Sequence, residues 1–526
     1  MELIRKNVHM DRQKSQASTQ ITLDDDYNVP DNKPDVLKLL IDKGQINVEE
    51  VKTAEGRVNV KGRLCFSVLY LSEKGANSVY STEGSVPFEE FIHMDGIQSG
   101  DSVKISYEQE DLSIALINSR KLSIKAVVTF TTQMSEVVDE ETLVEIRSEE
   151  PVEYRKKVID IIETAIDKND IYRIREIVEL PAGLPNIFEV LWESIRIGKL
   201  EFRAQEQKLV LQGEMMLFLL YEAEGEEGKN RWYERNIPFS GTVDCQGCDE
   251  RMLTDIKYEI SHIETEVRPD ADGEERSLAV DIVLNLNIRL YKEQQLELLA
   301  DIYGVTKEIS TQTKVGKYKG LLVKNEGKCR AEGKLRIKNN GARILQLCHG
   351  EGTVIADEIQ VIENGLEIEG VLEMQILYVT TDDNLPFYSL KGSIPFRYTL
   401  DVPDICQDCM YTIQTGIEQL AVGMVDSEEI EIKATLFMQA VVFCNKEETI
   451  ITDITVSEPD MDKLKALPGI TGYIAKQGDS LWQIGKRYYV PIKQIKETNH
   501  LSSDEIHAGD KLLIVKTIEN TRNEVV

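Results

Sequence analysis

Residues 62–70 read GRLCFSVLY, and this stretch decides the fold because the chain repeats its pattern twice more. Residues 213–221 read GEMMLFLLY and residues 370–378 read GVLEMQILY, each with Gly first and Tyr last. A proline follows 17 residues after each tyrosine, namely Pro87, Pro238 and Pro395. The copies start 151 and 157 residues apart, so each copy is a whole domain rather than a short solenoid unit.

Each copy has the pattern of a β domain. The run from Gly to Tyr is apolar and ends at a polar loop, as a buried strand does. Later in each copy, apolar residues alternate with polar ones, which is typical of a strand with one buried face. These alternating runs are 122–128, 278–284 and 430–436. We therefore predict a mainly β fold of three antiparallel, sandwich-like domains over residues 17–150, 151–305 and 306–456. Segment 151–168 fits either a helix or a strand.

A different pattern begins after the third copy. Residues 473–516 read YIAKQGDSLWQIGKRYYVPIKQIKETNHLSSDEIHAGDKLLIVK. Gly478 suits a tight turn, and Ser480 with Gln483 forms a capping box at the start of a helix. A second amphipathic helix follows Pro491, and a turn at Gly509 precedes an apolar strand. The order strand, helix, helix, strand is therefore expected in about 45 residues.

The charge of the chain limits its partners. The 526 residues carry a net charge of −31, which argues against nucleic acid and anionic membrane surfaces as main partners. Residues 471–516 carry a net charge of +2, so the acidic charge lies in the repeats. The N-terminus has no apolar signal-peptide core, and no window is long and apolar enough to span a membrane. Eight cysteines are too few for a disulfide scaffold. We expect a cytoplasmic protein without membrane insertion.

The segment after the repeats resembles a LysM domain, the small module that typically binds N-acetylglucosamine polymers. The resemblance lies in the spaced residues quoted above. Ala475 departs from it, because the family usually has Val there. It places a βααβ LysM domain at residues 472–517, behind a linker at 457–471 that contains two prolines and Gly469.

The whole chain resembles the spore coat morphogenetic proteins of the SipL and SpoVID type, which combine β-rich SPOCS domains with a C-terminal LysM domain. Three repeats and a short linker are more similar to the clostridial SipL branch. The resemblance implies a non-catalytic scaffold of spore coat assembly. Such a protein acts in the mother cell cytoplasm at the forespore surface. Its implied partners are stage IV sporulation protein A, the ATPase of the coat basement layer, and other coat proteins.

In LysM domains of the glycan-binding kind, the groove lies between the loop after the first strand and the loop before the last strand. The corresponding residues here are Gly478, Asp479, Ser480, Leu481, Trp482, Ile506, His507, Ala508 and Gly509. Main-chain groups in these loops can hydrogen-bond an amide, either of an N-acetyl group or of a peptide. Trp482 either contacts the ligand or packs on its own helix. His507 either contacts the ligand or is a solvated loop residue.

Other motifs do not indicate chemistry. Cys245 and Cys248 form one CxxC pair and Cys406 and Cys409 another, which fits a zinc site, redox pairs or buried thiols. The pairs lie in different repeats, so buried or incidental thiols are the favoured reading. The sequence has no HExxH, nucleophile elbow or Walker motif. We therefore predict no catalytic, cofactor or metal residues. Two alternative functions stay open: a peptidoglycan-binding or N-acetylglucosamine-binding protein, and a hydrolase with an unrecognised site in the repeats.

Overall fold

The computed structural model describes residues 1–526 except 73–78, 226–228, 338–342, 383–384, 459–467 and 517–526. Antiparallel strands make up almost all of it, and two short helices lie near its C-terminal end, which confirms the predicted mainly β class. Most of the predicted linker at 457–471 falls outside the described residues. Segment 151–168, which the sequence left open, lies in a strand from residue 152 onward.

Three groups of strands follow one another along the chain. The first group starts at Glu2, earlier than the predicted start at residue 17. It contains β1 (Glu2–Asn28), β2 (Lys38–Ala54), β3 (Arg57–Leu71), β4 (Val79–His93), β5 (Lys104–Asn118) and β6 (Lys121–Arg147). The second contains β7 (Val152–Glu179), β8 (Ile187–Ile197), β9 (Glu201–Gln205), β10 (Lys208–Ala223), β11 (Asn230–Asp244), β12 (Leu253–Pro269) and β13 (Glu275–Gly304). The third contains β14 (Glu308–Arg336), β15 (Ile344–Ile362), β16 (Gly365–Thr380), β17 (Phe387–Asp401), β18 (Met410–Met424) and β19 (Glu429–Ser457).

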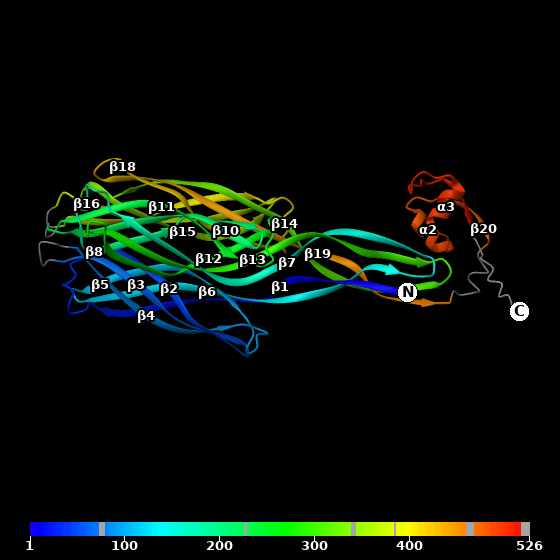
Figure 1. Cartoon of the computed structure of the whole chain (residues 1–526), viewed down its shortest axis with the longest axis horizontal. Helices are drawn as coiled ribbons and strands as arrows, with labels where there is room; N and C mark the ends of the chain where they lie inside the picture. Colours follow the sequence, from blue (N-terminus) through cyan, green and yellow to red (C-terminus); the bar gives the residue numbers. More distant parts are fainter. Residues whose placement is uncertain (73–78, 226–228, 338–342, 383–384, 459–467, 517–526) are drawn as a thin grey trace.

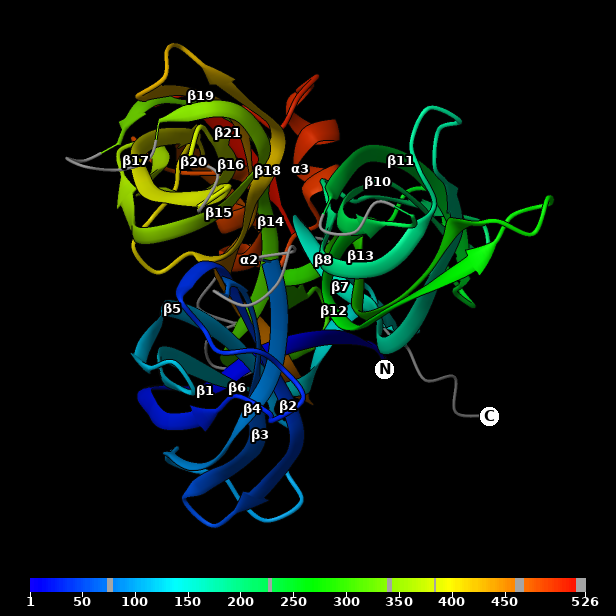
Figure 2. The same ribbon diagram turned by 90° about the vertical axis from the view of Figure 1, so that its left-hand side faces the viewer.

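Each group folds into two antiparallel sheets. One sheet is a meander, such as β2-β3-β4, and the other joins the first and the last two strands, such as β1-β6-β5. The alternating run predicted near residue 122 lies on β6, where Leu122, Ile124, Ala126 and Val128 are buried. They pack with residues of β3 in one core cluster, so the two sheets of each group enclose a core. Figure 2 shows the three resulting lobes around the long axis.

In the first and third repeats, close packing against backbone requires the glycine that opens the repeated stretch. A Cβ at Gly62 would lie 2.3 Å from the carbonyl oxygen of Asn47, and one at Gly370 would lie 2.1 Å from that of Ile355. In both places the neighbouring strand has a bulge, which pushes its backbone toward the glycine. At the other end of the stretch, the buried Tyr70 donates a hydrogen bond to the carbonyl oxygen of Pro34. In the first and third repeats the motif glycine therefore marks a bulge, and in the first repeat Tyr70 anchors a loop.

The outer strands continue beyond the lobes and form a stalk (Figure 1). β1 pairs with β6, β7 with β13 and β14 with β19, and each of these six strands has 27 to 30 residues. We call their distal parts the stalk: residues 2–12, 138–147, 152–163, 293–304, 308–319 and 446–457. Apolar side chains from all three ribbons meet there in two buried clusters. The three repeats therefore share a core that none of them has alone.

A buried ion pair crosses the base of the stalk. Asp11, Ile162 and Lys319 occupy the same position in three equivalent strands, because they keep the repeat spacing of Gly62 and its counterparts. Nζ of Lys319 lies 2.7 Å from Oδ1 of Asp11, and both side chains are at most 10% exposed. Burial raises the pKa of Asp11, but Lys319 and Arg289 outweigh it and hold the pKa below its usual value of 3.8. This contribution to stability is present above pH 3.8 and is lost as the pH falls through the lowered pKa.

Replacing Gly370 by Ala should weaken the third repeat. The added Cβ meets a backbone oxygen that cannot rotate away, so we expect a loss of about 1–3 kcal/mol in local stability, as for overpacking in a core. Hydrogen exchange in β15 and β16 measures this loss. Gly423→Ala is the matched control, because a Cβ there meets nothing within 4 Å. Equal exchange in both variants would contradict the assignment.

Replacing Lys319 by Met should destabilise the stalk, because it removes the cation nearest to the buried Asp11 and leaves the more distant Arg289, at 3.8 Å. Removing one partner of a buried ion pair typically costs about 3–5 kcal/mol, whereas replacing both partners by apolar residues is often neutral. We expect the double variant Asp11→Ile with Lys319→Met to recover most of the loss, because Ile162 already fills the equivalent position. Hydrogen exchange of β1 and β14 tests this. A double variant no more stable than Lys319→Met would refute it.

Candidate functional site

The C-terminal module contains β20 (Ile470–Ile474), α2 (Leu481–Tyr488), α3 (Ile492–Asn499) and β21 (Lys511–Val515). β20 and β21 pair in antiparallel fashion, and the helices cover one face of this sheet. Ser480 begins α2: its side chain accepts a hydrogen bond from the backbone N–H of Gln483, and the Gln483 side chain accepts one from Ser480 N–H. The predicted capping box is confirmed. Leu481 is fully buried in the core of the module rather than at its surface.

The first predicted loop is held by the carboxylate of Asp479. Its Oδ2 accepts hydrogen bonds from the backbone N–H of Lys476 and from the hydroxyl of Tyr473, both at 2.7 Å. These two bonds lower the pKa of Asp479, with the Lys476 N–H as the larger cause. Gly478 has φ = +90°, a conformation that favours glycine. The turn chemistry therefore fixes the backbone before Ser480.

The second predicted loop lies beside the first. The backbone of Ala475 joins them, because its N–H donates to the carbonyl oxygen of Asp510 at 2.9 Å and its carbonyl accepts from Gly509 N–H at 2.8 Å. The N–H of His507 donates to Oδ2 of Asp510, and Gly509 has φ = +98°. Ala475 is buried at this joint. The structure thus brings together the two loops that the sequence places at opposite ends of the module.

The nine predicted groove residues differ in exposure. Gly478, His507, Ala508 and Gly509 are exposed, whereas Asp479, Ser480 and Ile506 are half-buried. Leu481 and Trp482 are buried, so neither side chain faces solvent at this surface. A ligand at the two loops can therefore reach their main-chain groups and the side chains of His507 and Ala508. Whether these residues form a binding groove stays a prediction.

Trp482 occupies a place that neither sequence alternative anticipated: it packs against the stalk. Its ring lies edge-on to that of Tyr303, with 5.0 Å between the ring centroids. Its Nε1–H donates to Oδ2 of Asp301 at 2.7 Å, and Nζ of Lys486 donates to Oδ1 of the same carboxylate at 2.5 Å. Both Asp301 and Tyr303 lie at the end of β13. In this arrangement Trp482 is not available to a ligand.

The contact between module and stalk is closely fitted. The hydroxyl of Tyr303 donates to the carbonyl oxygen of Val490 at 2.9 Å, and a Cβ at Gly485 would lie 2.6 Å from that hydroxyl. Burial raises the pKa of Asp301, but the bonds from Lys486 and Trp482 outweigh it and keep the pKa below its usual value. The contact is therefore stabilised above pH 3.8 and weakens as the pH falls through the lowered pKa. One feature of the sequence indicates this contact: Trp482 lies outside the apolar stripe of α2 that contains Leu481 and Ile484.

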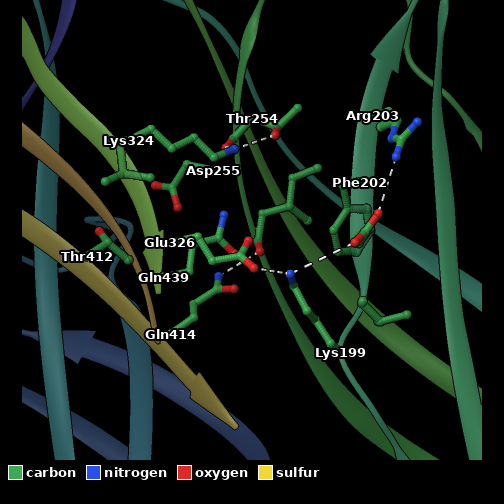
Figure 3. A pocket seen from close by; sticks show the side chains of 14 residues that line it. Lys199, Phe202, Arg203, Thr254, Asp255, Lys324, Glu326, Thr412, Gln414 and Gln439 are labelled. Carbon is green, nitrogen blue, oxygen red and sulfur yellow. Dashed lines mark hydrogen bonds and ion pairs between the residues drawn. The ribbon is translucent and has the colours of Figure 1, made fainter. Parts of the chain in front are cut away.

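A second candidate region lies where the repeats meet. A cavity of about 290 Å³ opens between the second and third repeats (Figure 3). Lys199 forms an ion pair with Glu326, and Nζ of Lys324 donates to the carbonyl oxygen of Thr254 at 2.8 Å. Asp255 lines this cavity and is only 7% exposed, and burial raises its pKa. These bonds run from one repeat to the next, so their evident role is to join the lobes.

The larger cavity at the axis, of about 1040 Å³, is lined by all three repeats. Lys104, Asp255 and Thr412 keep the repeat spacing and occupy equivalent positions around it. Nζ of Lys104 donates to Asp167 of the neighbouring repeat at 3.1 Å. Among the described residues, no three His, Cys, Asp or Glu side chains are grouped as a metal site requires. The polar groups at the axis thus differ between the repeats. Ion pairs such as Lys104 with Asp167 therefore favour one order of the repeats around the axis.

Two families of domains match this architecture. The SipL, SPOCS domain model matches residues 35–117, 186–268 and 343–425, and the LysM domain model matches residues 473–515. The chain therefore has the SipL-type architecture of three SPOCS domains and a C-terminal LysM domain. SPOCS and LysM domains are non-catalytic binding domains, so the SipL-type architecture indicates a spore-coat-related binding protein.

The N-acetylmuramidase relatives match only the LysM part. A "Probable N-acetylmuramidase" of Lactococcus lactis subsp. cremoris is 41% identical over 51 residues, which are 10% of this chain and 12% of that protein. The "Uncharacterized protein YkzQ" of Bacillus subtilis (strain 168) is 40% identical over 42 residues, 8% of this chain and 56% of that protein. The chain thus spans a small part of the muramidase and about half of YkzQ. No solved structure matches significantly. Among the described residues, no helix has the length and apolarity that crossing a membrane requires.

Replacing Asp301 by Ala should release the LysM domain from the stalk. Trp482 and Lys486 both lose their partner, so we expect the oxidation rate of Trp482 in hydroxyl-radical footprinting to rise several-fold. The LysM domain should stay folded, because its core excludes Trp482. Glu505→Ala, an exposed carboxylate of the same domain, is the matched control. Continued protection of Trp482 in the Asp301 variant would show that the carboxylate does not hold the domain.

Proposed function

We propose that the chain is a non-catalytic scaffold of spore coat assembly that holds a coat basement-layer protein through its LysM domain. Three SPOCS domains and one LysM domain support this role, since all four are binding domains. The resemblance to SipL-type proteins names the partner we propose, stage IV sporulation protein A. On the same resemblance, we propose that the chain acts in the mother cell at the forespore surface.

The observation that carries the proposal is the separation of the two kinds of binding domain. The stalk holds the LysM domain at one end of the molecule and the three lobes at the other (Figure 1). A protein bound at the LysM loops therefore leaves the lobe surfaces open to other coat proteins. Several binding domains on one chain also raise the effective concentration of each partner for the others. The acidic lobes and the slightly basic LysM domain suit partners of different charge.

A second candidate function is binding of N-acetylglucosamine polymers. The loops at Gly478 and Gly509 lie side by side and offer main-chain groups to an N-acetyl amide as readily as to a peptide. The similarity of this part to a probable N-acetylmuramidase favours it. The two candidates use the same loops, so one pair of variants tests both.

Replacing Ala508 by Trp tests the use of these loops. Ala508 is exposed in the second loop, so a large side chain there covers the loop surface without disturbing the core. We expect the full chain with Ala508→Trp to bind purified stage IV sporulation protein A at least tenfold more weakly in calorimetry. Ser502→Trp places the same side chain on an exposed loop elsewhere in the domain and should bind normally.

The alternatives give different outcomes. Equal binding by both variants and the unaltered chain shows that the loops do not dock this partner. Titration with N-acetylglucosamine oligomers then tests the second candidate. Saturable binding of the oligomers at millimolar concentration or below, lost in Ala508→Trp, favours the glycan-binding function. If the oligomers do not bind but stage IV sporulation protein A does, the scaffold function is favoured.

A further inference from the structure

In each repeat, two successive turns follow the last strand of the meander sheet, which is β4, β11 or β17. In each repeat, a residue with positive φ on the neighbouring hairpin holds the first turn: Gly56, Gln207 and Asn364. Its carbonyl oxygen accepts the N–H of the residue that begins the first turn, namely Met94, Cys245 or Val402. These positions keep the repeat spacing, so the turns are equivalent in the three repeats.

Cys245 and Cys248 serve as apolar core residues in the first turn. Met94 and Ile97 fill the same two positions in the first repeat, and both are buried. Cys245 and Cys248 are at most 2% exposed and lie in the apolar core of the second repeat. A buried free cysteine behaves as a small apolar residue. This pair needs no redox role to explain it.

Cys406 and Cys409 lie in the second turn, where no other repeat has cysteine. The N–H of Cys409 donates to the carbonyl oxygen of Cys406 at 3.1 Å. The equivalent turns, Gln98–Asp101 and Asp249–Met252, make the same hydrogen bond without thiols. The fold of the turn therefore does not require the two cysteines.

The second turn presents its thiols for reaction. Sγ of Cys406 lies 2.8 Å from Sγ of Cys409, and the N–H of Cys406 donates to Sγ of Cys409 at 3.2 Å. Cys406 is exposed, whereas Cys409 is buried. Burial raises the pKa of Cys409 to about 11. One thiol is thus open to a reagent from solvent and the other is held behind it.

We propose that Cys406 and Cys409 form a redox-active dithiol that is oxidised by small-molecule disulfides. The Cys406 thiolate attacks one sulfur of the disulfide, which forms a mixed disulfide and releases one thiolate. Cys409 then loses its proton to solvent and attacks Sγ of Cys406, which forms the Cys406–Cys409 disulfide and releases the second thiolate. The two cysteines lose two electrons, and the small disulfide is reduced to two thiols. The high pKa of Cys409 makes the second step the slower one.

The aromatic disulfide DTNB tests this in the reduced, folded full chain. We expect two equivalents of the coloured thiol from each chain at Cys406–Cys409, with no stable adduct. Peptide mass mapping should then show that the peptide with both cysteines has lost two hydrogen atoms. In Cys409→Ser, one equivalent is released and the adduct on Cys406 persists. In Cys406→Ser, the rapid release disappears.

The chain contains its own control. The double variant Cys245→Ser and Cys248→Ala should release the same rapid two equivalents, because the first-turn pair is buried. Cys65 and Cys444 are partly buried and contribute a slower background. Two outcomes overturn the proposal: a persistent adduct on Cys406 in the unaltered chain, or rapid release that survives in Cys406→Ser.

Discussion

The packing of three long β ribbons against one another supports the rest of the molecule. Val8, Ile159 and Ile450 come from different repeats and meet in one buried cluster of the stalk. A single two-stranded ribbon is marginally stable in water, because one of its faces has nothing to cover it. The three ribbons cover one another's apolar faces. This packing joins three lobes that would otherwise be linked only by the chain. The three repeats are therefore joined by a shared core.

The same strands connect this packing to the candidate site. Ile302 is buried in the second stalk cluster, and its neighbours Asp301 and Tyr303 hold the LysM domain. The residues that close the stalk and those that orient the module thus alternate along a single strand. A shift of β13 by one residue exchanges these two faces. The contact of Asp301 and Tyr303 with the module therefore orients the LysM loops relative to the stalk.

Local chemistry made much of this predictable from the sequence. The Gly–Tyr stretches, the alternating runs and the capping box at Ser480 each report a local constraint, and the structure shows them as strands and a helix start. The place of Trp482 was not predictable. A large apolar side chain in a sequence indicates that it is buried, but not which surface it packs against. The stalk was also missed. Alternation of apolar and polar residues in β7 and β13 indicates that one face is buried, but not which strands pack against that face. The open choice for residues 151–168 has the same cause: its apolar residues fit helical and extended spacing equally.

The six stalk strands have similar lengths, and this limits how insertions can alter the length of the stalk. The stalk extends roughly a dozen residues beyond the lobes, and a strand rises about 3.3 Å per residue, so it acts as a spacer on the order of 40 Å. Because side chains alternate, one residue inserted into a single strand would turn its apolar side outward beyond that point. Lengthening the spacer requires matched insertions of two residues in all three ribbons at once. The reach between lobes and module is therefore a dimension that single insertions cannot adjust.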